Sequence, residues 1–133
     1  MKNLPLVFSA MIVGITLFQS VLVAPAINKL INVEYASVLL RNIWPKFFVI
    51  TAVISFISFV ILIINSNQNL FKYISFISFV LMLICYFITP IINEAKDTLN
   101  NQLWTVLHLS TIIFTFITLI INTLTIVFWK SVN

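Results

Sequence analysis

The chain has 133 residues, of which 62% are hydrophobic and 8% carry a charge, and its mean hydropathy is +1.17. A water-soluble domain needs about a quarter of its residues charged, so this composition excludes a soluble globular protein. The net charge of +4 comes from Lys and Arg residues scattered singly at the ends of apolar stretches. These positions predict contacts with lipid headgroups, and we expect no nucleic-acid partner.

Four apolar stretches account for most of the chain, and each is long enough to cross a bilayer core of about 30 Å as an α-helix. We therefore predict an all-α fold, an antiparallel bundle of four transmembrane helices, in which residues 1–133 form a single integral membrane domain. The helices are expected at about residues 4–27, 45–64, 73–92 and 103–129. The main partner of such a chain is the lipid bilayer.

Prolines are expected to bound the first two helices. Pro25 stands near the end of the first stretch, where a residue without a backbone N–H can stop a helix. A connector over residues 28–44 follows it. Pro45 is suited to the first turn of a helix, because an N–H there has no intrahelical acceptor. The second helix is therefore expected to begin at Pro45.

Polar residues separate the remaining helices. The run at 65–69, Asn-Ser-Asn-Gln-Asn, predicts a short turn that returns the chain antiparallel. Pro90 is expected to distort the last turn of the third helix, and a polar connector then extends from Asn93 to Gln102. The stretch 103–129 would be about 40 Å long as a helix, so it must tilt or project from the bilayer.

Four crossings place both termini and the turn near residue 65 on one face of the membrane, which we call side A. The connectors at 28–44 and 93–103 lie on the opposite face, side B. Trp44 and Trp104 then fall on side B, whereas Tyr73 and Trp129 fall on side A. Tryptophan and tyrosine are enriched at both membrane interfaces, so their positions agree with four crossings.

The basic residues are divided almost equally between the two sides, and all three acids lie on side B. Side A carries Lys2, Lys72 and Lys130 without any acid. Because Lys and Arg are enriched on the cytoplasmic side, we expect both termini to be cytoplasmic. The expected location is the bacterial inner membrane, which the chain crosses as a multi-pass protein.

Polar residues form stripes along the predicted helices. On the fourth helix they follow one another at alternating steps of four and three residues, at positions 104, 108, 111, 115, 118, 122 and 125. This spacing is typical of left-handed helix packing, so we expect the stripe to face the bundle interior. Ala10-x-x-x-Gly14 would permit close approach of another helix. We interpret the hydroxyls as packing contacts and rank a permeation path last, because no charge lies in mid-membrane.

The rarer polar groups and prolines gather on side B and form the candidate binding or structural site. Its members are Pro25, Asn28, Arg41, Trp44, Pro45, Lys46, Pro90, Asn93, Trp104, His108 and Thr111. No phosphate loop, Cys/His metal set or nucleophile–base pair accompanies them, so we predict no catalytic residue and no metal site. The first hypothesis is a non-enzymatic binding or assembly protein whose side B binds a lipid, a partner membrane protein or a second copy.

His108, the single histidine, supports two interpretations. In the first, a neutral imidazole hydrogen-bonds to a neighbouring Ser, Thr or Asn and holds the register of the bundle. In the second, His108 binds haem or serves proton transfer, and the chain is a haem- or quinone-linked redox protein. A second haem ligand would have to be Met11 or Met82, or the iron would stay five-coordinate.

Four short motifs occur in order along the chain. They are Ala24-Pro25, Trp44-Pro45-Lys46-Phe47-Phe48, Pro90-Ile91-Ile92-Asn93 and Leu107-His108. Together they resemble the transmembrane protein 205-like proteins, a family of small four-helix membrane proteins of unknown function. The resemblance implies the fold and the membrane location, and it implies no reaction.

The chain also departs from the pattern of this family at three positions. Thr111 stands where the family has Ser, Thr115 where it has Asn, and Leu109 where a basic residue often follows the His. A family site that uses that charge or amide is therefore altered in this chain.

Overall fold

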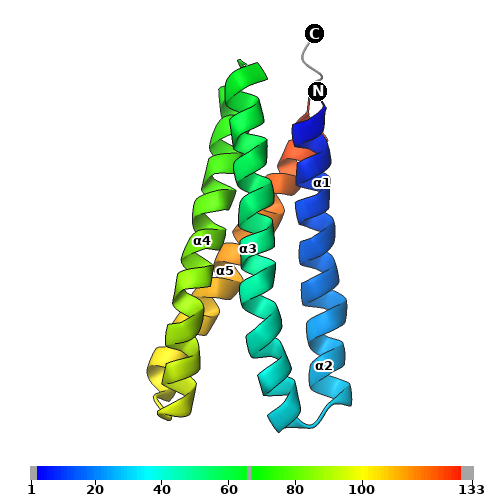
Figure 1. The fold of residues 1–133 in the computed structure, drawn as a ribbon. Helices are drawn as coiled ribbons and strands as arrows, with labels where there is room; N and C mark the ends of the chain where they lie inside the picture. Colours follow the sequence, from blue (N-terminus) through cyan, green and yellow to red (C-terminus); the bar gives the residue numbers. More distant parts are fainter. Residues whose placement is uncertain (1–2, 66, 130–133) are drawn as a thin grey trace.

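The computed structural model describes residues 3–65 and 67–129, and this part of the chain is almost entirely helical. Its elements are α1 (Leu4–Leu17), the π-helix η1 (Phe18–Val23), α2 (Ala24–Leu30), α3 (Val33–Asn65), α4 (Asn69–Asp97) and α5 (Asn101–Phe128) (Figure 1). Because α1, η1 and α2 run on without a break, these residues form four helical units, each long and apolar enough to cross a membrane. The predicted bundle of four antiparallel transmembrane helices is confirmed. Lys2 and Lys130, which contributed to the predicted orientation, lie outside the described residues.

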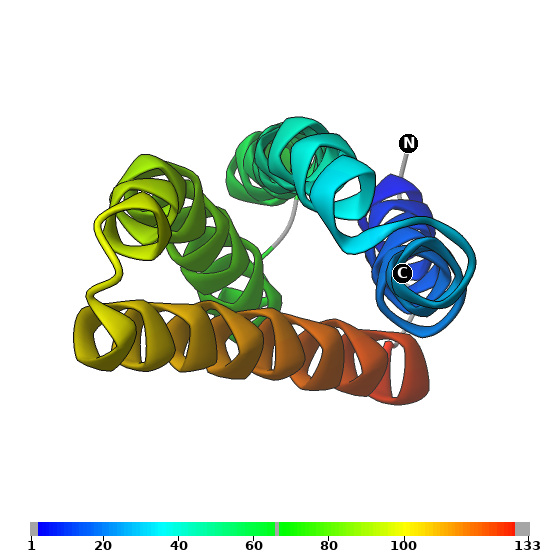
Figure 2. The same ribbon diagram turned by 90° about the horizontal axis from the view of Figure 1, so that it is seen from below.

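The four units pack in the ring order α1, α3, α4 and α5. α5 crosses the bundle obliquely, so that its first half lies beside α4 and its last half beside α1 (Figure 1, Figure 2). Trp129 Nε1 donates a hydrogen bond of 3.3 Å to Asn3 Oδ1, at the same end as the α3–α4 turn. That end is side A, and the α2–α3 and α4–α5 turns mark side B.

The half of the bundle near side A is tightly packed. Leu62, Phe71 and Ile74 form a buried cluster, and the partly buried side chains of Ile121 and Trp129 pack against it. Apolar contact is therefore continuous from α3 through α4 to α5 at this end.

Polar groups in the same half pair across helices. Ser58 Oγ lies 3.1 Å from Ser75 Oγ and joins α3 to α4. Asn122 Nδ2 donates to Ser78 Oγ at 2.8 Å and joins α5 to α4. The prediction that the polar stripe of the fourth helix faces the interior is confirmed by its buried members, Thr111, Thr115, Thr118, Asn122 and Thr125.

The predicted start of the second helix at Pro45 is wrong, because Pro45 lies inside α3. Pro90 lies inside α4, as expected, but this helix continues to Asp97 instead of ending near residue 92. α3 begins at Val33 and has 33 residues, a length of about 50 Å. It exceeds the hydrocarbon core of about 30 Å, so its first turns reach the interface. Water there can bond the carbonyl of Arg41, which lacks its usual donor at Pro45. Residues 33–44 and 93–97 are consequently helix, and the side-B connectors are short turns.

The first helical unit also differs from the prediction. It continues past Pro25 to Leu30, and η1 interrupts its α-helical bonding. The N–H of Ala24 bonds to the carbonyl of Gln19, five residues earlier. The wide turn leads directly into Pro25 at the start of α2, so the missing N–H of the proline is accommodated without ending the helix.

The expected close approach at Gly14 is also wrong. A Cβ atom built at this position meets no other atom within 4 Å. No neighbouring helix lies against this face of α1, so the small residues here do not form a helix contact.

Candidate functional site

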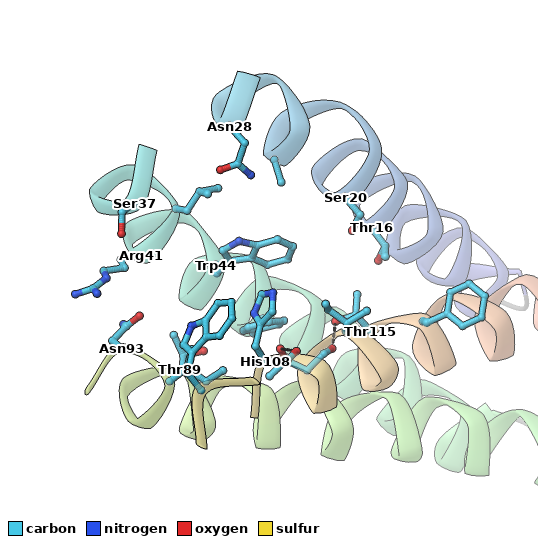
Figure 3. Close-up of a pocket in the computed structure, with 18 of the residues that line it drawn as sticks. Thr16, Ser20, Asn28, Ser37, Arg41, Trp44, Thr89, Asn93, His108 and Thr115 are labelled. Carbon is cyan, nitrogen blue, oxygen red and sulfur yellow. Dashed lines mark hydrogen bonds between the residues drawn. The ribbon is translucent and has the colours of Figure 1, made fainter. Parts of the chain in front are cut away.

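A cavity of about 830 Å³ lies in the half of the bundle near side B, and all four helical units contribute to its wall. We call it the side-B cavity (Figure 3). It exists because α5 leans toward α4 at this end, whereas α2 packs against α3 (Figure 2). The interhelical space that is filled near side A is therefore open here.

The π-helix shapes one wall of this cavity. Thr16, Ser20, Ala24 and Asn28 all line it, at steps of four residues along the first helical unit. In an α-helix of 3.6 residues per turn such steps drift around the axis. A π-helix has more residues per turn, so η1 offsets this drift and keeps the four side chains on one face. Figure 3 shows Thr16, Ser20 and Asn28 along this wall.

One hydroxyl in this wall lacks a hydrogen-bond partner. Thr16 is only 2% exposed, and its Oγ1 bonds to no group among the described residues. A buried hydroxyl without a partner costs free energy. This hydroxyl is buried within the wall, and the hydroxyls of Thr51 and Thr118, which do not line the cavity, also lack a partner among the described residues.

Apolar side chains form part of the deeper wall, which opens sideways. Leu17 and Val21 from the first unit and Ile112 and Phe116 from α5 line the cavity and also face the outside of the bundle. Val21 is 61% exposed and Phe116 is 60% exposed. We call the gap bounded by these four residues the lateral opening, and in a membrane it faces lipid chains.

The rim at side B is cationic. Arg41 and Lys96 are the charged residues among those that line the cavity in the described part of the chain. Arg41 binds Asp97 through two hydrogen bonds of 2.6 and 3.0 Å, which join α3 to α4. Lys96 Nζ donates to Ser37 Oγ at 3.4 Å, also between α4 and α3. The two contacts fix the positions of both cations.

Aromatic side chains lie just below this rim. The rings of Trp104 and His108 stack with centroids 5.0 Å apart and planes 10° apart. Trp44 stacks on Phe48 with centroids 5.7 Å apart. Trp44 and Trp104 both line the side-B cavity, in the half of the bundle where their predicted positions placed them.

His108 does not hold the register of the bundle through its imidazole. Its carbonyl accepts a hydrogen bond from Thr111 Oγ1, but neither ring nitrogen bonds to another group in the part of the chain that the structure describes. The expected bond to a neighbouring Ser, Thr or Asn is wrong, since stacking on Trp104 orients the ring instead. Both nitrogens are therefore available to a molecule in the cavity.

The structure divides the predicted side-B residues into three groups. Those that line the side-B cavity are Asn28, Arg41, Trp44, Asn93, Trp104, His108 and Thr111. Pro45 and Lys46 lie in a shallow groove on the outer surface between α3 and α4, together with Arg41. Pro25 and Pro90 line neither hollow.

The methionines considered as haem ligands lie apart from His108. Met82 is fully buried in a core cluster with Phe47 and Cys85. Met11 faces outward from α1, and neither methionine lines the side-B cavity. Among the described residues no group of three or more His, Cys, Asp or Glu side chains could hold a metal ion. The arrangement does not support a haem iron ligated by both His108 and a methionine.

Several cavity residues were not among the predicted site. Ser37 and Lys96 stand in segments expected to be connectors, and Thr16 and Ser20 resemble ordinary packing hydroxyls. The sequence did contain one signal for Thr16 and Ser20. Their spacing of four continues through Ala24 to Asn28, and a constant step of four fits one face only if the helix is locally widened.

The fold and the cavity define a class: a small multi-pass membrane protein with a cavity between its helices, open toward the bilayer. Residues 7–101 match the family model described as "Domain of unknown function (DUF4149)". Because the match covers more than half of the chain, the protein belongs to this uncharacterised family. The matched segment includes most of α1 and all of η1, α2, α3 and α4, whereas Trp104, His108 and Thr111 lie beyond it. Comparison with curated proteins and with solved structures finds no match.

Proposed function

We propose that this protein is a non-enzymatic binding protein that holds an amphiphilic molecule of the bilayer in its side-B cavity. The observation that supports this function is the order of chemistry along the cavity wall. Cations and amides stand at the rim, hydroxyls and aromatic rings lie below them, and apolar side chains surround the lateral opening. A membrane amphiphile has the same order from its headgroup to its chain.

The volume of the cavity is compatible with such a ligand. At about 830 Å³ it falls within the range of about 300–1,000 Å³ that is usual for small-molecule sites. The lateral opening lets the remainder of a long chain stay among the lipids, so the cavity need not enclose the whole molecule.

The test is to fill the cavity and measure bound ligand. Ser20 lines the side-B cavity, whereas Leu22, two residues along in η1, is exposed and does not line it. We expect native mass spectrometry of the detergent-purified protein to detect a bound amphiphile in the wild type and in Leu22→Trp. Ser20→Trp should lose it. Equal retention by both variants, or retention only of a partner protein or a second copy, would contradict the proposal.

A redox protein that binds a quinone through His108 is the second candidate. The free imidazole nitrogens in the cavity favour it, because a quinone carbonyl accepts hydrogen bonds and an isoprenoid chain could occupy the lateral opening. Absorption spectra of the purified protein and extraction of its bound molecules test this candidate. A Soret band would indicate haem instead, and the absence of both chromophores leaves the non-enzymatic function.

We also infer from the sequence which named group of proteins the chain resembles within its family, and how it is oriented in the membrane. The four ordered motifs support a transmembrane protein 205-like protein within the uncharacterised family, although Leu107-His108 lies outside the matched segment. Both termini are inferred to face the cytoplasm of a bacterial cell, so that side B faces the periplasm. A reporter fused after Asn133 tests this orientation, and activity of a periplasm-specific reporter would overturn it.

A further inference from the structure

We propose that the ligand of the side-B cavity is an anionic phospholipid, bound with its phosphate at Lys96 and Arg41 and with one acyl chain in the lateral opening. The inference rests on the proposed function and specifies the ligand class. It depends on the charges at the rim, on the pairing of Arg41, and on the depth at which each type of side chain occurs.

The rim has groups suited to a phosphate. Two cations line the cavity, and no carboxylate lies among the cavity-lining residues that the structure describes. Asn28 and Asn93 add amide groups that can donate hydrogen bonds (Figure 3). Phosphate oxygens accept hydrogen bonds from such cations and amides, whereas a choline or other cationic group would meet like charge here.

Asp97 does not line the cavity, and its carboxylate binds the Arg41 guanidinium from outside. Its side chain is 60% exposed, and that of Arg41 is 32% exposed, so the pair is accessible to solvent. The guanidinium fork that holds this carboxylate through two bonds can hold a phosphate in the same manner. Asp97 therefore competes with the headgroup for Arg41, and its removal should strengthen binding.

The cations and amides of the wall lie toward side B, whereas the deeper wall mixes hydroxyls with apolar side chains. Along α5 the cavity residues are, in order, Trp104, His108, Thr111, Ile112, Thr115, Phe116 and Leu119. The glycerol esters of a phospholipid would lie between the two ends.

Binding of two lipids with identical chains tests this inference. Delipidated protein in detergent is titrated with phosphatidylglycerol or phosphatidylcholine, and binding is measured by native mass spectrometry. We expect tighter binding of phosphatidylglycerol. Lys96→Gln should weaken it about fivefold, the effect of about one surface cation on an anionic lipid. Phosphatidylcholine also carries a phosphate, so Lys96→Gln should weaken its binding by a smaller factor, because the lost phosphate contact is offset by relief of the like charge at the choline.

Two further variants separate the rim from the general charge of side B. Lys46→Gln removes a cation from the outer groove and should leave the affinity for phosphatidylglycerol unchanged. Asp97→Asn should increase that affinity. Equal effects of Lys46→Gln and Lys96→Gln, or weaker binding in Asp97→Asn, would overturn the headgroup site.

The outcomes also distinguish this inference from the proposed function on which it rests. Equal binding of both lipids, blocked in each case by Ser20→Trp, would overturn the anionic headgroup and retain the amphiphile cavity. Binding of neither lipid, with no copurified amphiphile, would overturn both. Tight binding of glycerol phosphate without chains would contradict the role of the lateral opening.

Discussion

The two halves of this bundle contain the same types of polar residue, but these residues pair between helices in one half and line a cavity in the other. Near side A the hydroxyl and amide groups of α3, α4 and α5 meet, as in the pairs Ser58–Ser75 and Asn122–Ser78. Near side B the polar side chains of the same stripes, such as His108 and Thr115, line a cavity. The difference lies in the distance between helices, which the oblique path of α5 controls (Figure 1).

The comparison shows that a polar stripe in a membrane helix has no fixed meaning. Lipid excludes polar groups, so the stripe must turn inward wherever it occurs. Whether it then packs or forms a site depends on whether a second helix is close enough to fill the space. Thr115 Oγ1 bonds to the carbonyl of Thr111 in its own helix, so it can line a cavity without an interhelical partner.

The largest expected difference between the halves is their tolerance of volume. Ser78 has no exposed surface between α4 and α5, and Ser78→Trp should lower the free energy of unfolding by about 3 kcal/mol through overpacking. Ser20→Trp enters the side-B cavity and should change it by less than about 0.5 kcal/mol. Unfolding in mixed detergent micelles measures both. Similar losses would mean that the cavity is as filled as the packed half.

The next effect concerns a polar pair in the packed half. Asn122 Nδ2 donates to Ser78 Oγ and to the carbonyl of Thr118, so Asn122→Ala should cost about 1–2 kcal/mol of stability. Thr123→Ala is the matched control, because Thr123 is exposed and bonds only to its own helix. A control loss as large as that of Asn122→Ala would show that the interhelical bond is unimportant.

The corresponding change in the open half should have the opposite sign. Thr16→Val keeps the shape of the side chain and removes a buried hydroxyl without a partner. We expect the delipidated protein to gain up to about 1 kcal/mol of stability. A loss of stability without lipid would indicate that this hydroxyl is satisfied within the protein.

The smallest effect is predicted at Gly14. Because an added Cβ would meet nothing within 4 Å, Gly14→Ala should stabilise α1 by about 0.5–1 kcal/mol through its helix propensity. The measurement is again unfolding in micelles. Destabilisation would mean that a helix packs against this face in the membrane, in the manner that Ala10-x-x-x-Gly14 suggests from sequence.

The sequence alone predicted the four helices and the inward stripe of α5, because apolar length and polar spacing depend on local composition. It also placed Trp44, Trp104 and His108 at one end, since four crossings determine which helix ends meet. It failed at Pro45, where it began the second helix, and it ended the third helix near residue 92 instead of at Asp97. A proline prevents one backbone hydrogen bond, but whether the helix ends there depends on water and neighbouring helices.

The cavity itself could not be predicted, because it results from the crossing of α5 over its neighbours. Helix crossing is decided by packing over the whole bundle, for which the stripe supplies only one face. Lys96 and Ser37 were missed for a different reason. Their segments read as connectors, and only the continued helices α3 and α4 bring both residues to the rim.

Photo-crosslinking at two adjacent positions of α5 tests the central claim most directly. Both side chains have exposed surface, but Ile112 lines the side-B cavity at the lateral opening, whereas Ile113 does not line the cavity. A diazirine analogue of leucine is placed at either position in native membranes, bulk lipid is washed away in detergent, and the protein is irradiated. The account predicts a phospholipid adduct at position 112 and none at position 113. Equal adducts at both positions, or none at position 112, would contradict it.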